Sequence, residues 1–452
     1  MQPTRKKGYF IETFGCQMNV NDSEKVAGLL RAEGYEPAPS AAEAGVVFIN
    51  TCAVREKASQ KLFHALGRLR RLKQADPGVQ IGVGGCVAQL HGAEILERAP
   101  QVDVLVGTHT FARVPELLQK ARDERQAQVD LDRKADSFAV PSELVEHGNP
   151  VRAYVTVMEG CNHVCSFCVV PRTRGTEVCR PPRAIVHEVE GLVARGVPEV
   201  MLLGQTVNAY LFDDVDFPRL LERVGAVPGL RRLRFTTSHP EHMTREVARR
   251  LGQIPNLCPY IHLPFQSGSD RILASMRRGY TAAHYRDTVA WLREAIPGLA
   301  VSGDAIAGYP GETEADFQAT VDLVEQVELD GLFVFAYSPR PGTSALKLDD
   351  DVPAEEKRRR VNVLNTLQQR AQARRHAAYV GRVEEVLVEA VDGDGQVSGR
   401  TPQFKIVHLP GDAELVGTLV RVEITGAGPN SLLGRPAAPS ASLTDSSAVP
   451  IF

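Results

Sequence analysis

Short apolar runs alternate with longer stretches of helical period along roughly the first quarter of the chain. Three such runs, at 9–15, 46–51 and 81–85, are each followed by a stretch with the period of an amphipathic helix. Strands that alternate with helices form parallel sheets with right-handed crossovers and with helices on both faces. We therefore predict an α/β domain, built on a doubly wound parallel sheet, over residues 8–123.

A cysteine follows each of these three runs: Cys16, Cys52 and Cys86. The carboxyl ends of parallel strands lie along one edge of a sheet, so the three thiols are expected to converge there. Each cysteine is also expected where a helix begins, a position that favours a thiolate. Three separate structural cysteines are the alternative. Three equivalent positions favour a shared iron–sulfur site instead.

A second series of strands and helices follows a polar stretch, 124–146, that lacks periodicity and is predicted to be a linker. Its strand-like apolar runs are 151–158, 199–204, 233–238, 260–266, 299–308 and 331–337. This alternation predicts a partial (β/α)6 barrel over residues 147–377, with its site in the loops at the carboxyl ends of the strands.

The loop after the first of these strands carries Cys161, Cys165 and Cys168 in a CxxxCxxC spacing. Iron–sulfur clusters are held by cysteine thiolates, and three ligands leave one iron of a [4Fe–4S] cluster open to a small molecule. Zinc is the alternative, but its structural sites usually have four ligands in paired spacing, and His163 is too close to be a well-spaced fourth. With the aromatic Phe167 before the last cysteine, the pattern resembles the signature of the radical-SAM superfamily, in which the open iron binds S-adenosylmethionine (SAM).

Residues 378–437 have a different pattern, in which short β-type runs such as 383–388 and 419–424 are separated by glycine and aspartate turns. This pattern predicts a small antiparallel β-barrel. The last segment, 438–452, is rich in proline, alanine and serine and is predicted to be disordered.

The composition predicts where the protein is located, but it does not decide whether the protein binds nucleic acid. The 452 residues are 43% hydrophobic with a net charge of −3, so the chain as a whole has no basic signature of nucleic-acid binding. The densest basic run, 357–376, suits either a solvated helix face or a phosphate-facing stripe. No signal peptide or membrane-spanning run is found. Eight cysteines without a secretory signal indicate metal ligands in a reducing compartment, so we expect a cytoplasmic protein with no membrane contact.

The motifs together resemble the radical-SAM methylthiotransferase family, from about Gly8 to Arg435. They include 13–19, 50–57 and 84–88 in the first domain, 158–175, 203–210, 236–240, 263–270, 308–313 and 337–343 in the second, and a last domain that resembles the OB-like TRAM barrel. Sister branches differ after the first Gly-Cys: Pro-Lys-Asn is typical of the branch acting on a ribosomal protein, and Lys-Val-Asn of the branch acting on threonylcarbamoyl-adenosine. Gln17-Met18-Asn19 is similar to the MiaB-type tRNA branch.

The resemblance implies a transferase that methylthiolates carbon 2 of N6-isopentenyladenosine at tRNA position 37, adjacent to the anticodon. It implies two [4Fe–4S] clusters. The one on Cys161, Cys165 and Cys168 would cleave SAM to a radical, and the auxiliary one on Cys16, Cys52 and Cys86 would deliver the methylthio group. The alternatives are the same chemistry on threonylcarbamoyl-adenosine or a ribosomal protein, or a non-catalytic iron–sulfur RNA-binding regulator.

The resemblance also suggests contacts and partners. SAM is expected to meet residues near strand ends: Phe167, Gly204, Gln205, Ser238, Gln266 and Asp304. The RNA backbone is expected to meet basic residues in and before the last barrel: Arg358, Arg359, Arg360, Arg400 and Lys405. Besides isopentenylated tRNA, an electron donor of the flavodoxin or ferredoxin type and a donor of sulfur or iron–sulfur clusters are expected to act on a monomer.

Several residues have a structural interpretation as well. Gly204 equally suits a turn, and Asp304 equally suits an ion pair with an arginine. The run 313–316 predicts a helix capping box that begins at Thr313. No cluster motif includes Cys179 or Cys258, which are expected to be ordinary thiols, and histidines 239 and 262 are expected to be core or hydrogen-bonded residues.

Overall fold

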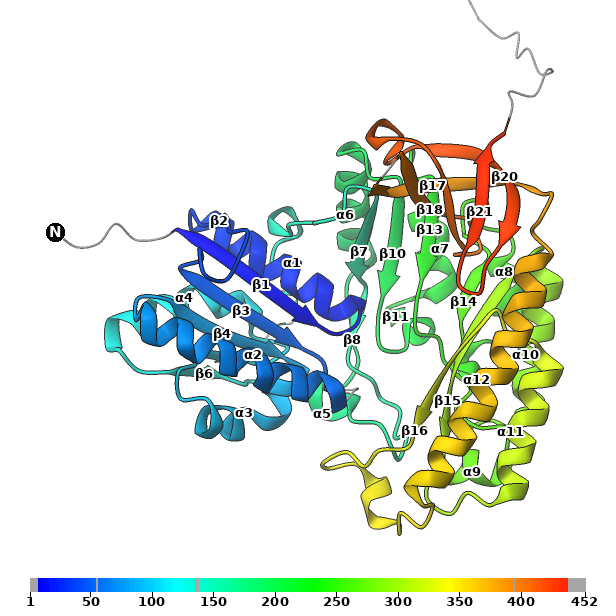
Figure 1. Ribbon diagram of the computed structural model, residues 1–452, viewed down its shortest axis with the longest axis horizontal. Helices are drawn as coiled ribbons and strands as arrows, with labels where there is room; N and C mark the ends of the chain where they lie inside the picture. The colour runs from blue at the N-terminus through cyan, green and yellow to red at the C-terminus, as the bar shows by residue number, and fades with distance from the viewer. Residues whose placement is uncertain (1–6, 54–55, 135, 137, 394, 438–452) are drawn as a thin grey trace, which may run out of the picture. The chain divides into compact units, whose positions relative to one another are not determined.

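The computed structural model describes residues 7–53, 56–134, 136, 138–393 and 395–437 (Figure 1). The chain divides into two compact units, Met1–Gln368 and Gln369–Phe452. No helix in the described ranges is long and apolar enough to cross a membrane.

The first part of the larger unit is a parallel sheet of six strands in the order β2-β1-β3-β4-β5-β6. The strands are β1 (Gly8–Phe14), β2 (Glu36–Pro37), β3 (Val46–Thr51), β4 (Gln80–Gly85), β5 (Val104–Val106) and β6 (Gln128–Asp130). This confirms the predicted doubly wound sheet. The stretch predicted as a linker, 124–146, supplies β6 to this sheet and the short helix η2 (Ser142–Leu144).

Helices cover both faces of this sheet. Alternate side chains of a strand point to opposite faces, and in β3 Val46 and Phe48 join a core with α1 (Gln17–Ala32) and α4 (Val114–Glu124). Val47 and Ile49 join the core on the other face, with α2 (Glu56–Ala75) and α3 (Cys86–Arg98). Another short helix, η1 (Phe111–Arg113), precedes α4.

The second part of the unit holds six parallel strands in two sheets, ordered β13-β10-β7 and β14-β15-β16 (Figure 1). They are β7 (Arg152–Thr156), β10 (Glu199–Leu203), β13 (Arg232–Phe235), β14 (Tyr260–His262), β15 (Ala300–Ala307) and β16 (Gly331–Ala336). A parallel bridge between Leu233 and Leu257 links the sheets. The predicted six-stranded partial barrel is confirmed, although each strand is shorter than the apolar run that predicted it.

Helices follow the strands, and all of them except α9 (Asp270–Ser275) contribute to one large core; α9 packs in a smaller cluster with Tyr309 and Tyr337. The others are α6 (Pro182–Ala194), α7 (Phe217–Gly225), α8 (Arg245–Leu251), α10 (Ala282–Ala295), α11 (Glu314–Val327) and α12 (Ala354–Ala377). The connections contain β8 (Met158–Glu159), α5 (Val170–Thr173), β9 (Val178–Cys179), η3 (Val207–Ala209), β11 (Leu211–Phe212), β12 (Val215–Asp216), η4 (Pro240–His242) and η5 (Ser344–Lys347).

One buried ion cluster spans the β7-β10-β13 sheet. Glu199 of β10 accepts hydrogen bonds from Arg152 of β7 and from Arg234 of β13, and all three side chains are buried. Burial raises the pKa of Glu199, but the two guanidinium groups outweigh this effect and hold it below its ordinary value.

The smaller unit contains a closed barrel in the order β17-β18-β19-β21-β20. Its strands are β17 (Val383–Gly393), β18 (Gln396–Arg400), β19 (Ile406–Pro410), β20 (Leu419–Ala427) and β21 (Leu432–Pro436), with η6 (Ala413–Leu415) between β19 and β20. The predicted barrel is confirmed, but it is not wholly antiparallel, because β19 and β21 run parallel where they close it. The segment predicted to be disordered, 438–452, lies outside the described residues.

Candidate active site

The first three cysteines lie at the carboxyl ends of three neighbouring strands, β1, β3 and β4. The backbone N–H of Cys52 donates to Phe14 O at 2.9 Å, which joins two of these ends. A hydrogen bond from Cys52 is the main cause that lowers the pKa of Cys16 to about 6, and the charge of Cys16 acts on Cys86. The structure thus brings the three thiols together.

Helix starts accompany two of these thiols. Cys16 is the N-cap of α1, and Cys86 is the first residue of α3. For Cys52 the same expectation falls on residues 54–55, which lie outside the described residues. Burial raises the pKa of Cys86 because a thiolate is poorly solvated there.

Paired asparagines hold this edge of the sheet in shape. The Asn19 amide donates to Asn50 Oδ1 at 3.1 Å, and Asn50 Nδ2 donates to Asn19 O at 2.8 Å. Both side chains are fully buried, so the pair fixes the turn after β1 against the end of β3. Gly85 has a φ of +94°, and a Cβ there would lie 2.3 Å from Asn50 Oδ1. Only glycine therefore fits directly before Cys86.

The second set of cysteines lies on the loop after β8. The backbone N–H of Gly160 donates to Gln205 Oε1 at 2.7 Å, and that of Cys161 donates to Gly175 O at 3.1 Å. The Cys161 thiol lies 3.3 Å from Thr206 Oγ1. Arg278 donates to Cys165 Sγ at 3.4 Å. Side chains from the end of β10 and the loop after α9 thus hold the cysteine loop in place.

The chemistry of these three thiols fits a bound cation. Burial raises the pKa of Cys161, and burial raises that of Cys168 to about 12, with further increases from the charges of Cys165 and Cys161. Three thiolates therefore do not form together at neutral pH unless a cation offsets their charge. Metal ligands must be deprotonated and a bound metal supplies that charge, so the set fits an iron–sulfur cluster.

Five of the six residues predicted to contact SAM lie on this loop or after strand ends, whereas Asp304 lies within β15. A Cβ on Gly204 would lie 2.6 Å from Met158 Cγ, so the glycine permits close packing behind the cysteine loop. The buried Ser238 Oγ has no hydrogen-bond partner within the described ranges, which leaves it available to a ligand. The other predicted contacts are Gln205, which holds Gly160; Gln266, which has a φ of +72°; Asp304, which lies 3.5 Å from His262; and Phe167, which packs against a buried cluster that includes Tyr309.

Three of the basic residues predicted to contact RNA form ion pairs within the chain. Arg359 and Arg360 both pair with Glu314 and Glu356, while Arg358 is exposed. In the barrel of the smaller unit, Arg400 pairs with Glu389 and stacks on Phe404, and Lys405 is buried. Their contacts with RNA stay a prediction.

A buried charge network that the sequence analysis missed joins the two halves of the larger unit. Arg174, which follows α5, donates to Asp22 of α1 at 2.5 Å and lies 3.6 Å from Glu159. Lys25 of α1 lies 3.7 Å from the same carboxylate, and all four side chains are at most 9% exposed. Burial raises the pKa of Glu159, although the two cations beside it oppose that shift.

Arg174 also reaches the first set of cysteines. Its hydrogen bond and charge lower the pKa of Cys86, against the larger effect of burial, and its charge contributes to the low pKa of Cys16. Val169, the residue after Cys168, belongs to the same buried cluster as Cys86. The segment that follows the second set of cysteines thus meets the first set, by the packing of Val169 beside Cys86 and by the charge of Arg174 on Cys16 and Cys86.

Comparison with known proteins places this geometry in a family. Three family profiles match: "Uncharacterized protein family UPF0004" over residues 8–107, "Radical SAM superfamily" over 155–324 and "TRAM domain" over 377–437. The chain is 47% identical over 437 residues to the tRNA-2-methylthio-N(6)-dimethylallyladenosine synthase of Geobacter metallireducens, covering 95% of this chain and 98% of that protein. The protein of that name from Thiobacillus denitrificans is 48% identical over 441 residues, with the same coverage. The chain belongs to this synthase family.

Membership of the tRNA-2-methylthio-N(6)-dimethylallyladenosine synthase family confirms the branch that Gln17-Met18-Asn19 indicated. A solved structure with a similar fold is the radical S-adenosylmethionine methyltransferase TsrM from Kitasatospora setae. Its TM-score is 0.55 at 14% identity, covering 86% of this chain and 79% of that one. At this identity the likeness concerns the fold alone.

Proposed function

We propose that this chain transfers a methylthio group to carbon 2 of N6-isopentenyladenosine in tRNA, adjacent to the anticodon. The observation that carries the proposal is the pair of three-thiol sets, each at a strand end of its own sheet, with Val169 and Arg174 of the segment after the second set reaching the first. Relatives of the synthase family match along nearly the whole chain, which supports the same substrate here.

We infer two [4Fe–4S] clusters, one on Cys161, Cys165 and Cys168 and an auxiliary one on Cys16, Cys52 and Cys86. When bound, they supply the electron that cleaves SAM and the site from which sulfur and its methyl group are delivered. The residues around the clusters position the thiols and offset their negative charge. We call Cys161, Cys165 and Cys168 the SAM-side set. Thr206 and Arg278 hold Cys161 and Cys165 of this set, and the charge of Arg174 favours thiolates at the auxiliary set.

Two further partners follow from the chemistry. Cleavage of SAM consumes an electron and methylthiolation consumes a sulfur atom, so a flavodoxin- or ferredoxin-type donor and a sulfur donor are required.

The TRAM barrel offers a compact domain of the kind that binds nucleic acid through a face and its loops, with Arg400 on β18 as a candidate contact.

The test is nucleoside mass spectrometry of isopentenylated tRNA after incubation with the anaerobically reconstituted protein, SAM, sulfide and a reductant. A product heavier by a methylthio group is expected, and Cys16→Ala and Cys161→Ala should each abolish it. Cys179→Ala is the matched control, because this half-buried cysteine belongs to neither set, and its product should be unchanged.

The same assay separates the alternatives. If 5′-deoxyadenosine forms while this tRNA is unchanged, the radical chemistry holds and the substrate is a different one, such as threonylcarbamoyl-adenosine or a protein side chain. If two intact clusters give neither 5′-deoxyadenosine nor modified RNA, the protein is a non-catalytic binder and the proposal fails.

A further inference from the structure

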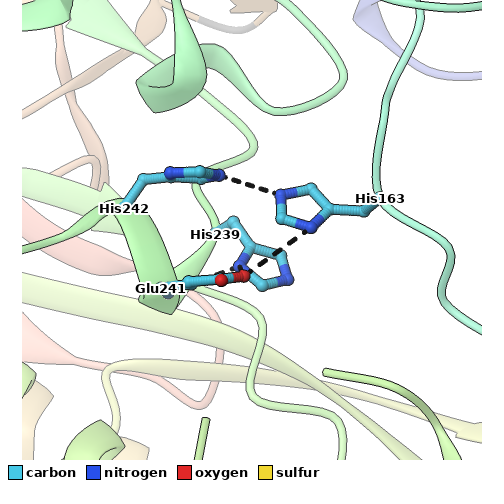
Figure 2. Close-up of side chains that lie close together, drawn as sticks. All are labelled: His163, His239, Glu241 and His242. Carbon is cyan, nitrogen blue, oxygen red and sulfur yellow. Dashed lines mark hydrogen bonds and ion pairs between the residues drawn. The ribbon is translucent and has the colours of Figure 1, made fainter. Parts of the chain in front are cut away.

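Three histidines and a glutamate gather beside the SAM-side cysteine loop (Figure 2). His163 lies on that loop, between Cys161 and Cys165 in sequence. The other three come from the turn after β13, where His239 is the N-cap of η4 and Glu241 and His242 lie within it. One nitrogen from each imidazole and one carboxylate oxygen all lie within 4.8 Å of one another. In sequence His163 is too close to the cysteines to be a well-spaced fourth ligand of their cluster, but the fold places it beside ligands from a distant segment.

Several contacts in the group are already close. His163 Nε2 lies 2.9 Å from His242 Nε2, and Glu241 Oε2 lies 3.7 Å from His163 Nδ1 and 3.8 Å from His239 Nδ1. The rings of His163 and His239 stack at 4.0 Å. Four ligands around a tetrahedral Zn²⁺ are about 3.4 Å apart. An ion can take only one nitrogen from each ring, so binding requires His163 to rotate out of its stack with His239 and the half-exposed Glu241 to move towards the bound ion.

The group offers donor atoms of the kinds that transition metals take, three imidazole nitrogens and one carboxylate oxygen. Glu241 adds the one anionic ligand. It has room because residue 279 is glycine: a Cβ there would lie 2.9 Å from Glu241 Oε2.

We propose that His163, His239, Glu241 and His242 bind one divalent transition-metal ion of the Zn²⁺ class. Three imidazoles and one carboxylate suit Zn²⁺, Fe²⁺ or Ni²⁺, whereas the all-thiol sets select iron–sulfur clusters. The ion joins the cysteine loop to η4 and so limits movement of Cys161 and Cys165. The proposal is independent of the methylthiolation substrate. Its competitor is a metal-free group in which His163 and His242 share a proton.

The probe is Zn²⁺ alone, added to the holoprotein after both iron–sulfur clusters are loaded, so that the thiols are occupied. After dialysis, zinc and iron are measured per chain by mass spectrometry. One zinc per chain is expected in the native protein, and His242→Ala should lose it while retaining its iron. His187→Ala is the matched control: its side chain is 71% exposed and lies outside the group, and this variant should keep one zinc.

Glu241→Gln keeps the size of an exposed side chain and decides the matter if His242→Ala does not fold. It should bind zinc at least about tenfold more weakly, because the only anionic ligand is lost. X-ray absorption at the zinc edge should show nitrogen and oxygen neighbours at about 2.0 Å and no sulfur. The proposal is overturned if no zinc is retained, if zinc has sulfur neighbours, or if His242→Ala and Glu241→Gln both bind zinc as the native protein does.

Discussion

Replacing Asp22 with asparagine tests the buried network that joins the two halves of the larger unit. Arg174 donates to Asp22 at 2.5 Å, and neither side chain is more than 2% exposed. Burial lowers the pKa of Arg174, but Asp22 and its neighbours outweigh this and raise it well above its ordinary value. A guanidinium group does not lose its proton in proteins, so Asp22→Asn leaves a buried charge with Glu159 as its nearest remaining carboxylate, 3.6 Å away.

The magnitude follows from the burial. With charge centres about 4 Å apart and an effective dielectric constant of about 20, the lost attraction is about 4 kcal/mol. Removing one partner of a buried pair costs about 3–5 kcal/mol in measured cases, in agreement with this value. Removing both charges is less costly, because no unpaired charge is left. Asp22→Asn with Arg174→Met should therefore be more stable than Asp22→Asn alone.

The assay is urea unfolding of the cluster-loaded protein, followed by the fluorescence of Trp291, which is the only tryptophan of the chain and belongs to the larger unit. The midpoint should fall while the slope is unchanged. Glu246→Gln is the control, since it breaks an ion pair with Arg249 in which both side chains are more than half exposed, and it should not shift the midpoint measurably. A loss below about 1 kcal/mol for Asp22→Asn, or additive effects in the double variant, would refute the reasoning.

Three further predictions concern the frame around the site. Glu199→Gln should remove part of the pH dependence of the free energy of unfolding. Because the pKa of Glu199 is lowered beside Arg234, its charge stabilises the fold above the ordinary carboxyl pKa. The difference in stability between native protein and variant, measured by urea midpoints across pH, should therefore narrow as the pH falls below about 4.5. Gly28→Ala should cost about 3 kcal/mol or more in the same assay, because a Cβ would lie 1.4 Å from Leu144 O; a loss within about 0.5 kcal/mol would contradict this. Gly160→Ala, with a φ of +81° and a carbonyl oxygen 2.0 Å from the added Cβ, should lower the iron content of the SAM-side site while circular dichroism is retained, and full iron content would count against it.

Local patterns in the sequence predicted most of the frame. Strand–helix alternation was enough for both regions of parallel strands, because successive parallel strands are joined by helical crossovers of fixed handedness. The capping box at Thr313 is confirmed, since its hydroxyl and the Asp316 carboxylate each meet the other residue's backbone. The convergence of Cys16, Cys52 and Cys86 followed from one rule about strand ends.

Contacts between distant segments were not predictable. The Asp22–Arg174 pair joins residues 152 positions apart, and no periodicity relates them. His163 was set aside because ligand spacing along the chain says nothing of side chains brought from another strand. In the last barrel β19 pairs in parallel with β21, although β20 lies between them in the sequence. Turns of the hairpin type predict only antiparallel pairs of successive strands, so this pairing was not predictable.

The burial of Val169 means that the first two domains of this chain cannot be separated without loss of packing. Three family profiles match along it, as though it were assembled from interchangeable modules, yet this valine directly after Cys168 is buried in the core of the preceding sheet domain. A fragment cut before residue 147 would expose that side chain and leave Arg174 without Asp22. The whole of Met1–Gln368 is therefore the unit to transfer, and grafting either of its two sheet domains onto another protein requires grafting its neighbour as well.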